Sequence, residues 1–96
     1  MQKNQIRAQD LFLWAALRGN YVAQFELAKR YETRIGVQKS LVDAHVWYSL
    51  ASSNKTYELE AKSRIIEIDR HFSDAQRAEA SVRRDLLVKK IVSTRK

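Results

Sequence analysis

Apolar residues recur three or four positions apart along most of the chain, the spacing that places side chains on one face of an α-helix. Between residues 20 and 33, for example, Ala23, Leu27 and Tyr31 lie four positions apart. No segment alternates between apolar and polar residues for long enough to predict a strand, and no Asn-Gly pair separates two β-rich runs. The pattern therefore predicts an all-α protein.

Local end signals divide this pattern into five predicted helices. Gly19 can close the first, because glycine readily takes the left-handed conformation that ends helices. Gly36 is expected to give the link between the second and third helices the same freedom. Ser40 can cap the third, with Asp43 as its capping-box partner. The expected helices are at about residues 5–18, 20–33, 40–51, 56–71 and 73–90.

Two further caps are predicted in the C-terminal half. Thr56 follows a polar break and can cap the fourth helix. Ser73 and Gln76 match a capping box, in which each side chain bonds the backbone of the other residue. Because the links between successive helices are short, neighbouring helices should lie antiparallel. We therefore expect a short α-solenoid of antiparallel helical hairpins.

Length and composition narrow the class of protein. The chain has 96 residues, enough for one domain with a modest core, and no cysteine, which excludes disulfides and thiolate chemistry. Its longest apolar run, residues 11–17, is far shorter than the roughly 20 residues of a membrane span. We expect no membrane span and a cytoplasmic protein, or a periplasmic one if a signal peptide has been removed.

The net charge of +7 is concentrated at one end. Residues 83–96 hold six Lys or Arg and one acid, so they carry +5 and leave +2 for residues 1–82. We expect 1–82 to be the helical domain and 83–96 a basic helix end and tail. We favour a solvated helix end whose cations complement the helix dipole. The alternative is a nucleic-acid-binding segment that uses Arg83, Arg84, Lys89, Lys90, Arg95 and Lys96.

The polar residues do not form a recognisable catalytic pattern. His45 and His71 lie 26 residues apart, which is not the spacing of a metal site on one helix. Glu58 and Glu60 are two residues apart, so on a helix they point to different faces. The chain also lacks the glycine-rich loops that hold phosphates. We therefore expect no enzyme activity, no metal and no cofactor.

Residues 23–51, AQFELAKRYETRIGVQKSLVDAHVWYSLA, resemble a Sel-one-like repeat, a relative of the tetratricopeptide repeat. The residues that carry the resemblance are Ala23, Leu27, Tyr31, Gly36, Val37, Ala44, Trp47, Tyr48 and Ala51. The sequence departs from the family at Ala28 and Arg34, where glycine is usual, at Ser40, where Asp is usual, and at Ser52, where a second Ala is usual. The resemblance implies one well-matched repeat at 23–52 and divergent closing helices at 56–90.

The same resemblance implies a function, because Sel-one-like proteins serve as assembly adaptors and are not enzymes as a class. We expect a non-enzymatic adaptor or scaffold that binds a segment of a partner protein. Trp47 and Tyr48 are expected to fill the core, since aromatic residues at helical spacing usually pack. Polar and amphipathic candidates for the inner face of the solenoid are Tyr21, Gln24, Arg30, Arg34 and Tyr57.

The run LFLWAAL at 11–17 is apolar on every side of its helix. Phe12, Leu13 and Trp14 cannot all face one neighbouring helix, and such a helix is normally covered on several sides. We expect these three residues to contact another polypeptide, either a second copy of the chain or a larger protein. The alternative is that the last helix folds back and covers this surface.

Overall fold

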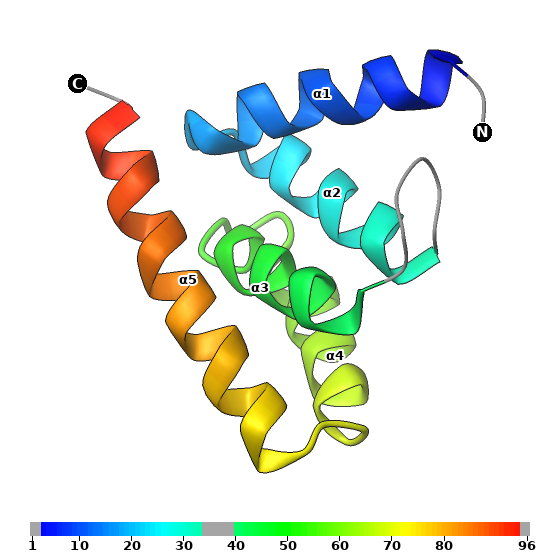
Figure 1. Cartoon of the computed structure of the whole chain (residues 1–96), viewed down its shortest axis with the longest axis vertical. Helices are drawn as coiled ribbons and strands as arrows, with labels where there is room; N and C mark the ends of the chain where they lie inside the picture. The colour runs from blue at the N-terminus through cyan, green and yellow to red at the C-terminus, as the bar shows by residue number, and fades with distance from the viewer. Residues whose placement is uncertain (1–2, 34–39, 95–96) are drawn as a thin grey trace.

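The structure is a computed structural model that describes residues 3–33 and 40–94, with the side chains of residues 3–7 and 94 left aside. These ranges contain helices and no strand. The five helices are α1 (Lys3–Leu17), α2 (Tyr21–Thr33), α3 (Leu41–Ala51), α4 (Glu58–Asp69) and α5 (Asp74–Thr94), shown in Figure 1. The predicted all-α class with about five helices is confirmed.

The turn between α1 and α2 has the backbone conformation that its residues favour. Gly19 has a φ of 89°, the left-handed conformation that the sequence predicts there. Asn20 follows, and its Oδ1 accepts a hydrogen bond of 2.9 Å from the backbone N–H of Ala23. This bond satisfies one of the unpaired N–H groups at the start of α2. Gly36, expected to act similarly, lies outside the described residues.

Two of the predicted caps are present and one is not. The Ser40 Oγ accepts a hydrogen bond of 3.1 Å from the N–H of Asp43, so Ser40 caps α3. Ser73 and Gln76 form the full capping box at α5, with bonds of 2.8 and 3.2 Å. The prediction that Thr56 caps α4 is wrong, because α4 begins at Glu58. The Oδ1 of Asn54 accepts a bond of 2.9 Å from the Thr56 N–H and holds that residue in the preceding turn.

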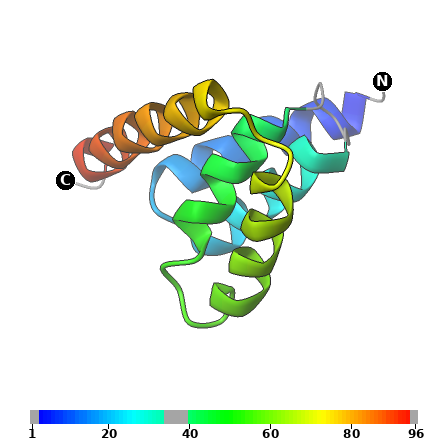
Figure 2. The same ribbon diagram turned by 90° about the horizontal axis from the view of Figure 1, so that it is seen from below.

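Helix α3 is the centre of the fold. It contacts α2, α4 and α5, and Figure 2 shows it between α4 and α5. Trp47 and Tyr48 are only 4% and 1% exposed, so their predicted place in the core is confirmed. Buried alanines share this core and let the helix backbones approach closely; these are Ala16, Ala23, Ala28, Ala44, Ala51, Ala61 and Ala80.

Helix α5 continues through the basic segment to Thr94. Ile91 is buried, and Leu87 packs against the core. Residues 83–94 are thus part of the packed domain, and a boundary at residue 82 would cut through a helix.

Helix α1 is only partly covered by the rest of the chain. It contacts α2 and α5, whose C-terminal end approaches it in Figure 1. Phe12 and Leu13 are half-buried and pack against the core, whereas Trp14 stays 59% exposed. The last helix thus folds back onto α1, as the alternative interpretation of the apolar run predicted, but it leaves Trp14 exposed.

Candidate functional site

A groove runs between α2 and α4, with α3 as its floor. We call it the inner groove. It is open to solvent and has a volume of about 670 Å³. Its floor is apolar, with Leu41 and Tyr48 from α3 and the buried Ile68 from α4. Its rims are polar, with Lys29 and Thr33 on α2 and Glu60, Arg64 and Glu67 on α4.

A chain of polar contacts fixes the floor of the inner groove. The hydroxyl of Tyr48 donates a hydrogen bond of 2.7 Å to Oε1 of Glu32. The other carboxylate oxygen of Glu32 accepts from the guanidinium of Arg64, forming an ion pair. Because the three residues belong to α3, α2 and α4, the contacts hold all three helices in register.

Electrostatics keep Tyr48 and Arg64 each in one protonation state at neutral pH. Burial raises the pKa of the Tyr48 hydroxyl, and the neighbouring Glu32 raises it further. The hydrogen bond to Glu32 likewise raises the pKa of the Arg64 guanidinium. Tyr48 therefore stays a hydrogen-bond donor and Arg64 stays a cation.

Acidic side chains stand on the α4 rim. Glu60 and Glu67 are seven residues apart, so they lie on the same side of α4. Glu67 pairs with Arg70 at 3.5 Å across a contact exposed to solvent. On the opposite rim, Lys29 pairs with Glu26 at 3.0 Å. Exposed pairs of this kind contribute little energy, so these side chains can exchange their contacts for those of a ligand.

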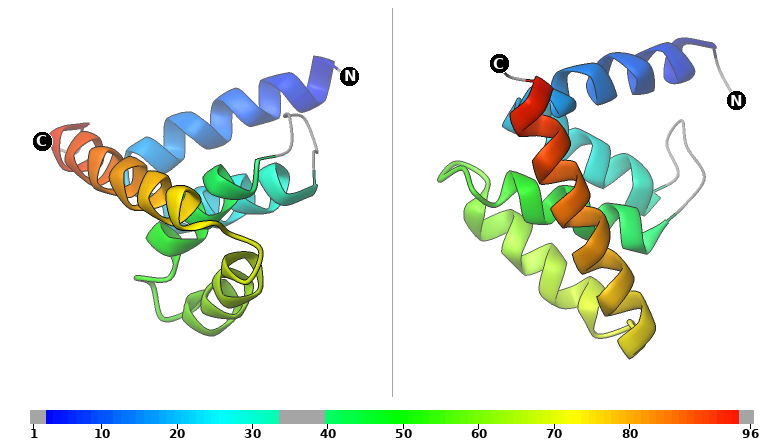
Figure 3. Two further views of the ribbon diagram at one scale, coloured as in Figure 1. Left: turned by 60° about the horizontal axis from the view of Figure 1, so that its bottom comes forward. Right: turned by 60° about the vertical axis from the view of Figure 1, so that its left-hand side comes forward.

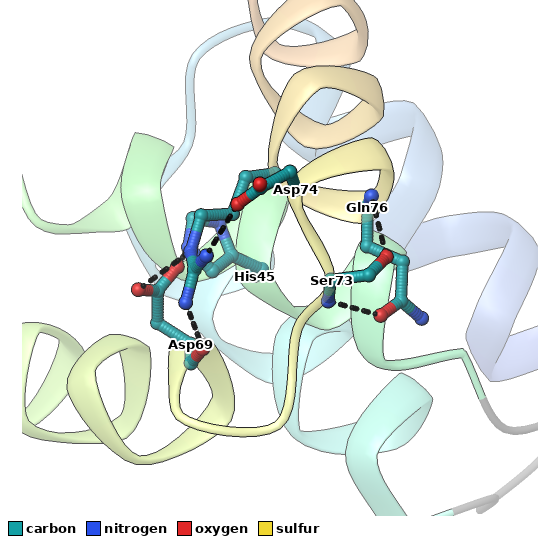
Figure 4. Close-up of polar contacts among 6 residues, drawn as sticks. His45, Asp69, Ser73, Asp74 and Gln76 are labelled. Atoms are coloured by element: carbon teal, nitrogen blue, oxygen red, sulfur yellow. Dashed lines mark hydrogen bonds and ion pairs between the residues drawn. The ribbon is translucent and has the colours of Figure 1, made fainter.

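A second polar cluster lies where α3, α4 and α5 meet (Figure 4). The Nε2 atom of His45 is 3.6 Å from Oδ1 of Asp69, and Nε of Arg77 is 3.2 Å from Oδ2 of the same carboxylate. Arg77 also donates to the Asp69 backbone carbonyl at 3.1 Å. Burial lowers the pKa of His45, although Asp69 opposes that shift. The cluster ties α5 to the end of α4.

His45 and His71 lie far apart in the sequence, on α3 and just beyond α4. In the part of the chain that the structure describes, no group of three or more His, Cys, Asp or Glu side chains is placed so that it could hold a metal ion. His71 is exposed just beyond the end of α4 and lines the rim of the inner groove.

The residues predicted to bind a partner lie elsewhere. The guanidinium of Arg30 covers the ring of Phe12, 4.9 Å from its centroid. The ring of Tyr57 stacks on Phe25 at 4.9 Å, and Tyr21 lines a smaller cleft beside the C-terminal end of α5. Of the predicted residues that are described, none lines the inner groove; they are Phe12, Leu13, Trp14, Tyr21, Gln24, Arg30 and Tyr57.

Gln24 requires a correction, because its expected place at an exposed edge is wrong. The residue is only 3% exposed, and its Nε2 donates a bond of 3.2 Å to the backbone carbonyl of Ala16. Gln24 follows Ala23 on α2, and α1 packs against α2. The side chain of Gln24 therefore links these two helices. Arg34, also predicted at the inner face, lies outside the described residues.

The basic residues of the alternative function are partly engaged within the fold. Arg83 is 2.6 Å from Oδ1 of Asp43 on α3 and 2.8 Å from Oε2 of Glu79. Arg84 lies 3.6 Å from Oδ1 of Asp85. Lys89 and Lys90 lie on the exposed side of α5, while Arg95 and Lys96 are outside the described residues.

Sequence reasoning missed Glu32 and Arg64, the two charged residues that hold Tyr48 in the groove floor. One signal pointed to them indirectly: a buried tyrosine hydroxyl needs a polar partner. Their separations from Tyr48 are 16 residues in either direction, and no local spacing rule reaches that far. Only the packing of three helices brings them together.

Within the described helices, none has both the length and the hydrophobicity that a membrane crossing requires. Comparison with protein-family models, curated proteins and solved structures gives no match to this chain. The resemblance to Sel-one-like repeats stays a prediction from residues 23–51.

Proposed function

We propose that this chain is a non-enzymatic protein-interaction module, a small adaptor or scaffold subunit that holds a segment of a partner protein in the inner groove. The observation that carries the proposal is the groove itself, an open space of about 670 Å³ with an apolar floor and polar rims. Volumes of this order are typical of ligand sites. The resemblance to Sel-one-like repeats supports the same class of function.

The construction of the groove supports binding rather than turnover. The contacts of Tyr48 and Arg64 with Glu32 hold its floor in one shape before a ligand arrives. A preformed surface loses less conformational entropy on binding, which favours affinity. The polar groups of Tyr48, Glu32 and Arg64 bond one another, so the apolar floor is left for a ligand side chain.

The chemistry of the rims predicts the kind of segment that fits. An apolar side chain would rest against Leu41 and Ile68, and a basic side chain beside it would meet Glu60 on α4. We therefore expect a short amphipathic segment that carries at least one Lys or Arg. Charges at a rim act mainly on association rate and specificity, while the buried apolar contact supplies most of the affinity.

Affinity capture with matched variants tests the proposal. The double variant Glu60→Lys, Glu67→Lys reverses the charge of the α4 rim without touching the floor. Asp85→Lys makes a similar change to an exposed acid on α5, away from the groove. We expect the rim variant to lose a partner that both the wild type and Asp85→Lys retain. A folded rim variant that retains every partner would contradict groove binding.

Nucleic-acid binding through residues 83–96 is the alternative, and the engagement of Arg83 with Asp43 and Glu79 makes it the weaker one. Deleting the segment is a poor test, since Ile91 belongs to the core. The double variant Lys89→Ala, Lys90→Ala tests nucleic-acid binding and leaves Ile91 in the core. If the segment binds duplex DNA, the binding constant should fall steeply as the salt concentration rises. A plot of the logarithm of one against the logarithm of the other should fall with a slope of about 0.9 per phosphate neutralised, and the slope should be smaller for the variant.

A further inference from the structure

The side of α5 that faces away from the core carries exposed apolar residues together with the charged Asp85 and Lys89. Ala80 and Ile91 point inward and are buried, whereas Val82 and Leu86 are 59% and 60% exposed. Exposed alanines continue the same line toward the start of the helix, at the three- and four-residue spacing of one helical face. We call this line the outer stripe; it consists of Ala75, Ala78, Val82 and Leu86. In the right-hand view of Figure 3, α5 lies in front, and no other helix of the described chain covers it.

We propose that the outer stripe joins two copies of this chain through an antiparallel pair of α5 helices. In such a pair Val82 packs against Leu86 of the second copy, and Leu86 against its Val82. The contact is self-complementary, as the two-fold symmetry of a homodimer requires. The apolar residues supply the attraction, because they lose their contact with water when the helices meet.

The charges beside the outer stripe argue for a second copy as the occupant. Glu79 and Lys90 are 11 residues apart, about three helical turns, so they lie on the same flank within roughly 20° of each other around the helix. When Val82 opposes Leu86 of the second copy, Glu79 comes beside Lys90 of that copy. The two-fold axis repeats the contact, which gives two pairs of opposite charge.

The opposite orientation of the two helices would be unfavourable. In a parallel pair, residues of equal number lie at the same height, so Lys89 of one copy would approach Lys90 of the other. Like charges in contact destabilise a helix pair and select against that arrangement. The charged residues beside the outer stripe therefore favour self-association and select the antiparallel orientation of the two helices.

The size of the outer stripe predicts a weak dimer. One pair of helices buries less than the roughly 800 Å² per partner of a standard protein interface. We expect a dissociation constant in the micromolar range and a dimer in exchange with its monomer. The inner groove is lined by α2, α3 and α4, so it stays open in both copies. The dimer would then present two grooves at once, and a divalent partner would gain avidity.

Self-association is tested by analytical ultracentrifugation of the purified chain from low micromolar to submillimolar concentration. We expect the wild type to move from monomer toward dimer, and Leu86→Glu to stay a monomer. Leu59→Glu is the matched control, because Leu59 is an even more exposed leucine, at 86%, on α4. A wild type that is monomeric throughout, or a Leu59→Glu variant as monomeric as Leu86→Glu, would overturn the proposal. So would a dimer lost on Trp14→Glu but kept on Leu86→Glu.

A charge exchange tests the antiparallel register. Glu79→Lys and Lys90→Glu each place like charges together at both sites, so each should weaken dimerisation by roughly tenfold, equal to about 1.4 kcal/mol. The double variant restores opposite charges and should dimerise as the wild type does. Circular dichroism establishes that each variant keeps its helices, because Glu79 also pairs with Arg83 within the chain. A double variant no better than either single variant would overturn the proposed register.

Discussion

The hydroxyl of Tyr48 donates a hydrogen bond of 2.7 Å to Oε1 of Glu32, a residue 16 positions earlier in the chain. The ring of Tyr48 is buried in α3, while Glu32 lies on α2 and pairs with Arg64 on α4. A single carboxylate thus joins the three helices that form the inner groove. The shape of the groove depends on this junction.

Removing the Tyr48 hydroxyl should destabilise the protein. Tyr48→Phe keeps the ring but leaves one oxygen of a partly buried carboxylate without its donor. Hydrogen bonds to charged groups contribute about 1.5 to 3 kcal/mol, so we expect a loss of that order in the free energy of unfolding, measured by urea denaturation. Tyr21→Phe, at a half-buried tyrosine outside the inner groove, is the control. Equal losses of unfolding free energy in the two variants would show that the Tyr48–Glu32 hydrogen bond stabilises the protein no more than the hydroxyl of Tyr21 does.

The two tryptophans should respond very differently to truncation. Trp47 is 4% exposed, so Trp47→Ala leaves a cavity and should cost about 3 to 5 kcal/mol. Trp14 is 59% exposed, so Trp14→Ala should cost less than about 1 kcal/mol. Chemical denaturation of both variants measures the difference. A small loss at Trp47 would contradict its place in the core.

The capping box at the start of α5 should contribute measurably to stability. Ser73→Ala removes the acceptor for the Gln76 N–H and should cost about 0.5 to 2 kcal/mol. Ser81→Ala makes the same chemical change at an exposed position inside α5, where alanine favours the helix. Thermal unfolding should therefore show a lower midpoint for Ser73→Ala than for Ser81→Ala. The reverse order would rule out a capping role for Ser73.

His45 should make the protein less stable as the pH falls. Burial, the largest cause, lowers its pKa in the folded state below the ordinary value of 6.5; Asp69 opposes the shift and Arg84 adds to it. The unfolded chain then binds the proton more readily than the folded one. The contribution of His45 is present above pH 6.5 and is lost as the pH falls through that value toward the folded-state pKa.

Proton NMR measures this shift directly. The variant His71→Gln leaves a single imidazole in the chain, so the remaining titration curve belongs to His45. We expect a midpoint below 6.5 in the folded protein. A midpoint at or above that value would show that the contact with Asp69 outweighs burial.

The fold could be predicted from the sequence where its signals are local. Gly19 ends a helix because of its own backbone freedom, and Ser73 and Gln76 meet each other within one turn. Thr56 failed as a predicted cap because Asn54, two residues earlier, accepts the hydrogen bond from its N–H. Which of these two polar side chains bonds the backbone depends on the geometry of the turn, and the sequence alone does not reveal that geometry.

The candidate site could be predicted only in part. Spacing predicted Tyr48 on a packed face, and a buried tyrosine hydroxyl needs a polar partner. The partner is Glu32, and its second contact is Arg64, 32 residues further along the chain. Gln24 shows the opposite error, since a polar residue beside Ala23 proved to be buried where α1 and α2 meet. Contacts between helices decide both cases.

Site-specific photo-crosslinking tests most directly whether a partner segment binds in the inner groove. A benzophenone side chain is placed at Glu60, on the groove rim, or at Lys62, an exposed residue on the opposite side of α4 and outside the groove lining. The protein is irradiated in its native complex, and the crosslinked peptides are sequenced by mass spectrometry. The result we predict is one defined segment, amphipathic and basic, attached at position 60 and absent at position 62. Crosslinks of equal yield at both positions, or at position 62 alone, would contradict binding in the groove.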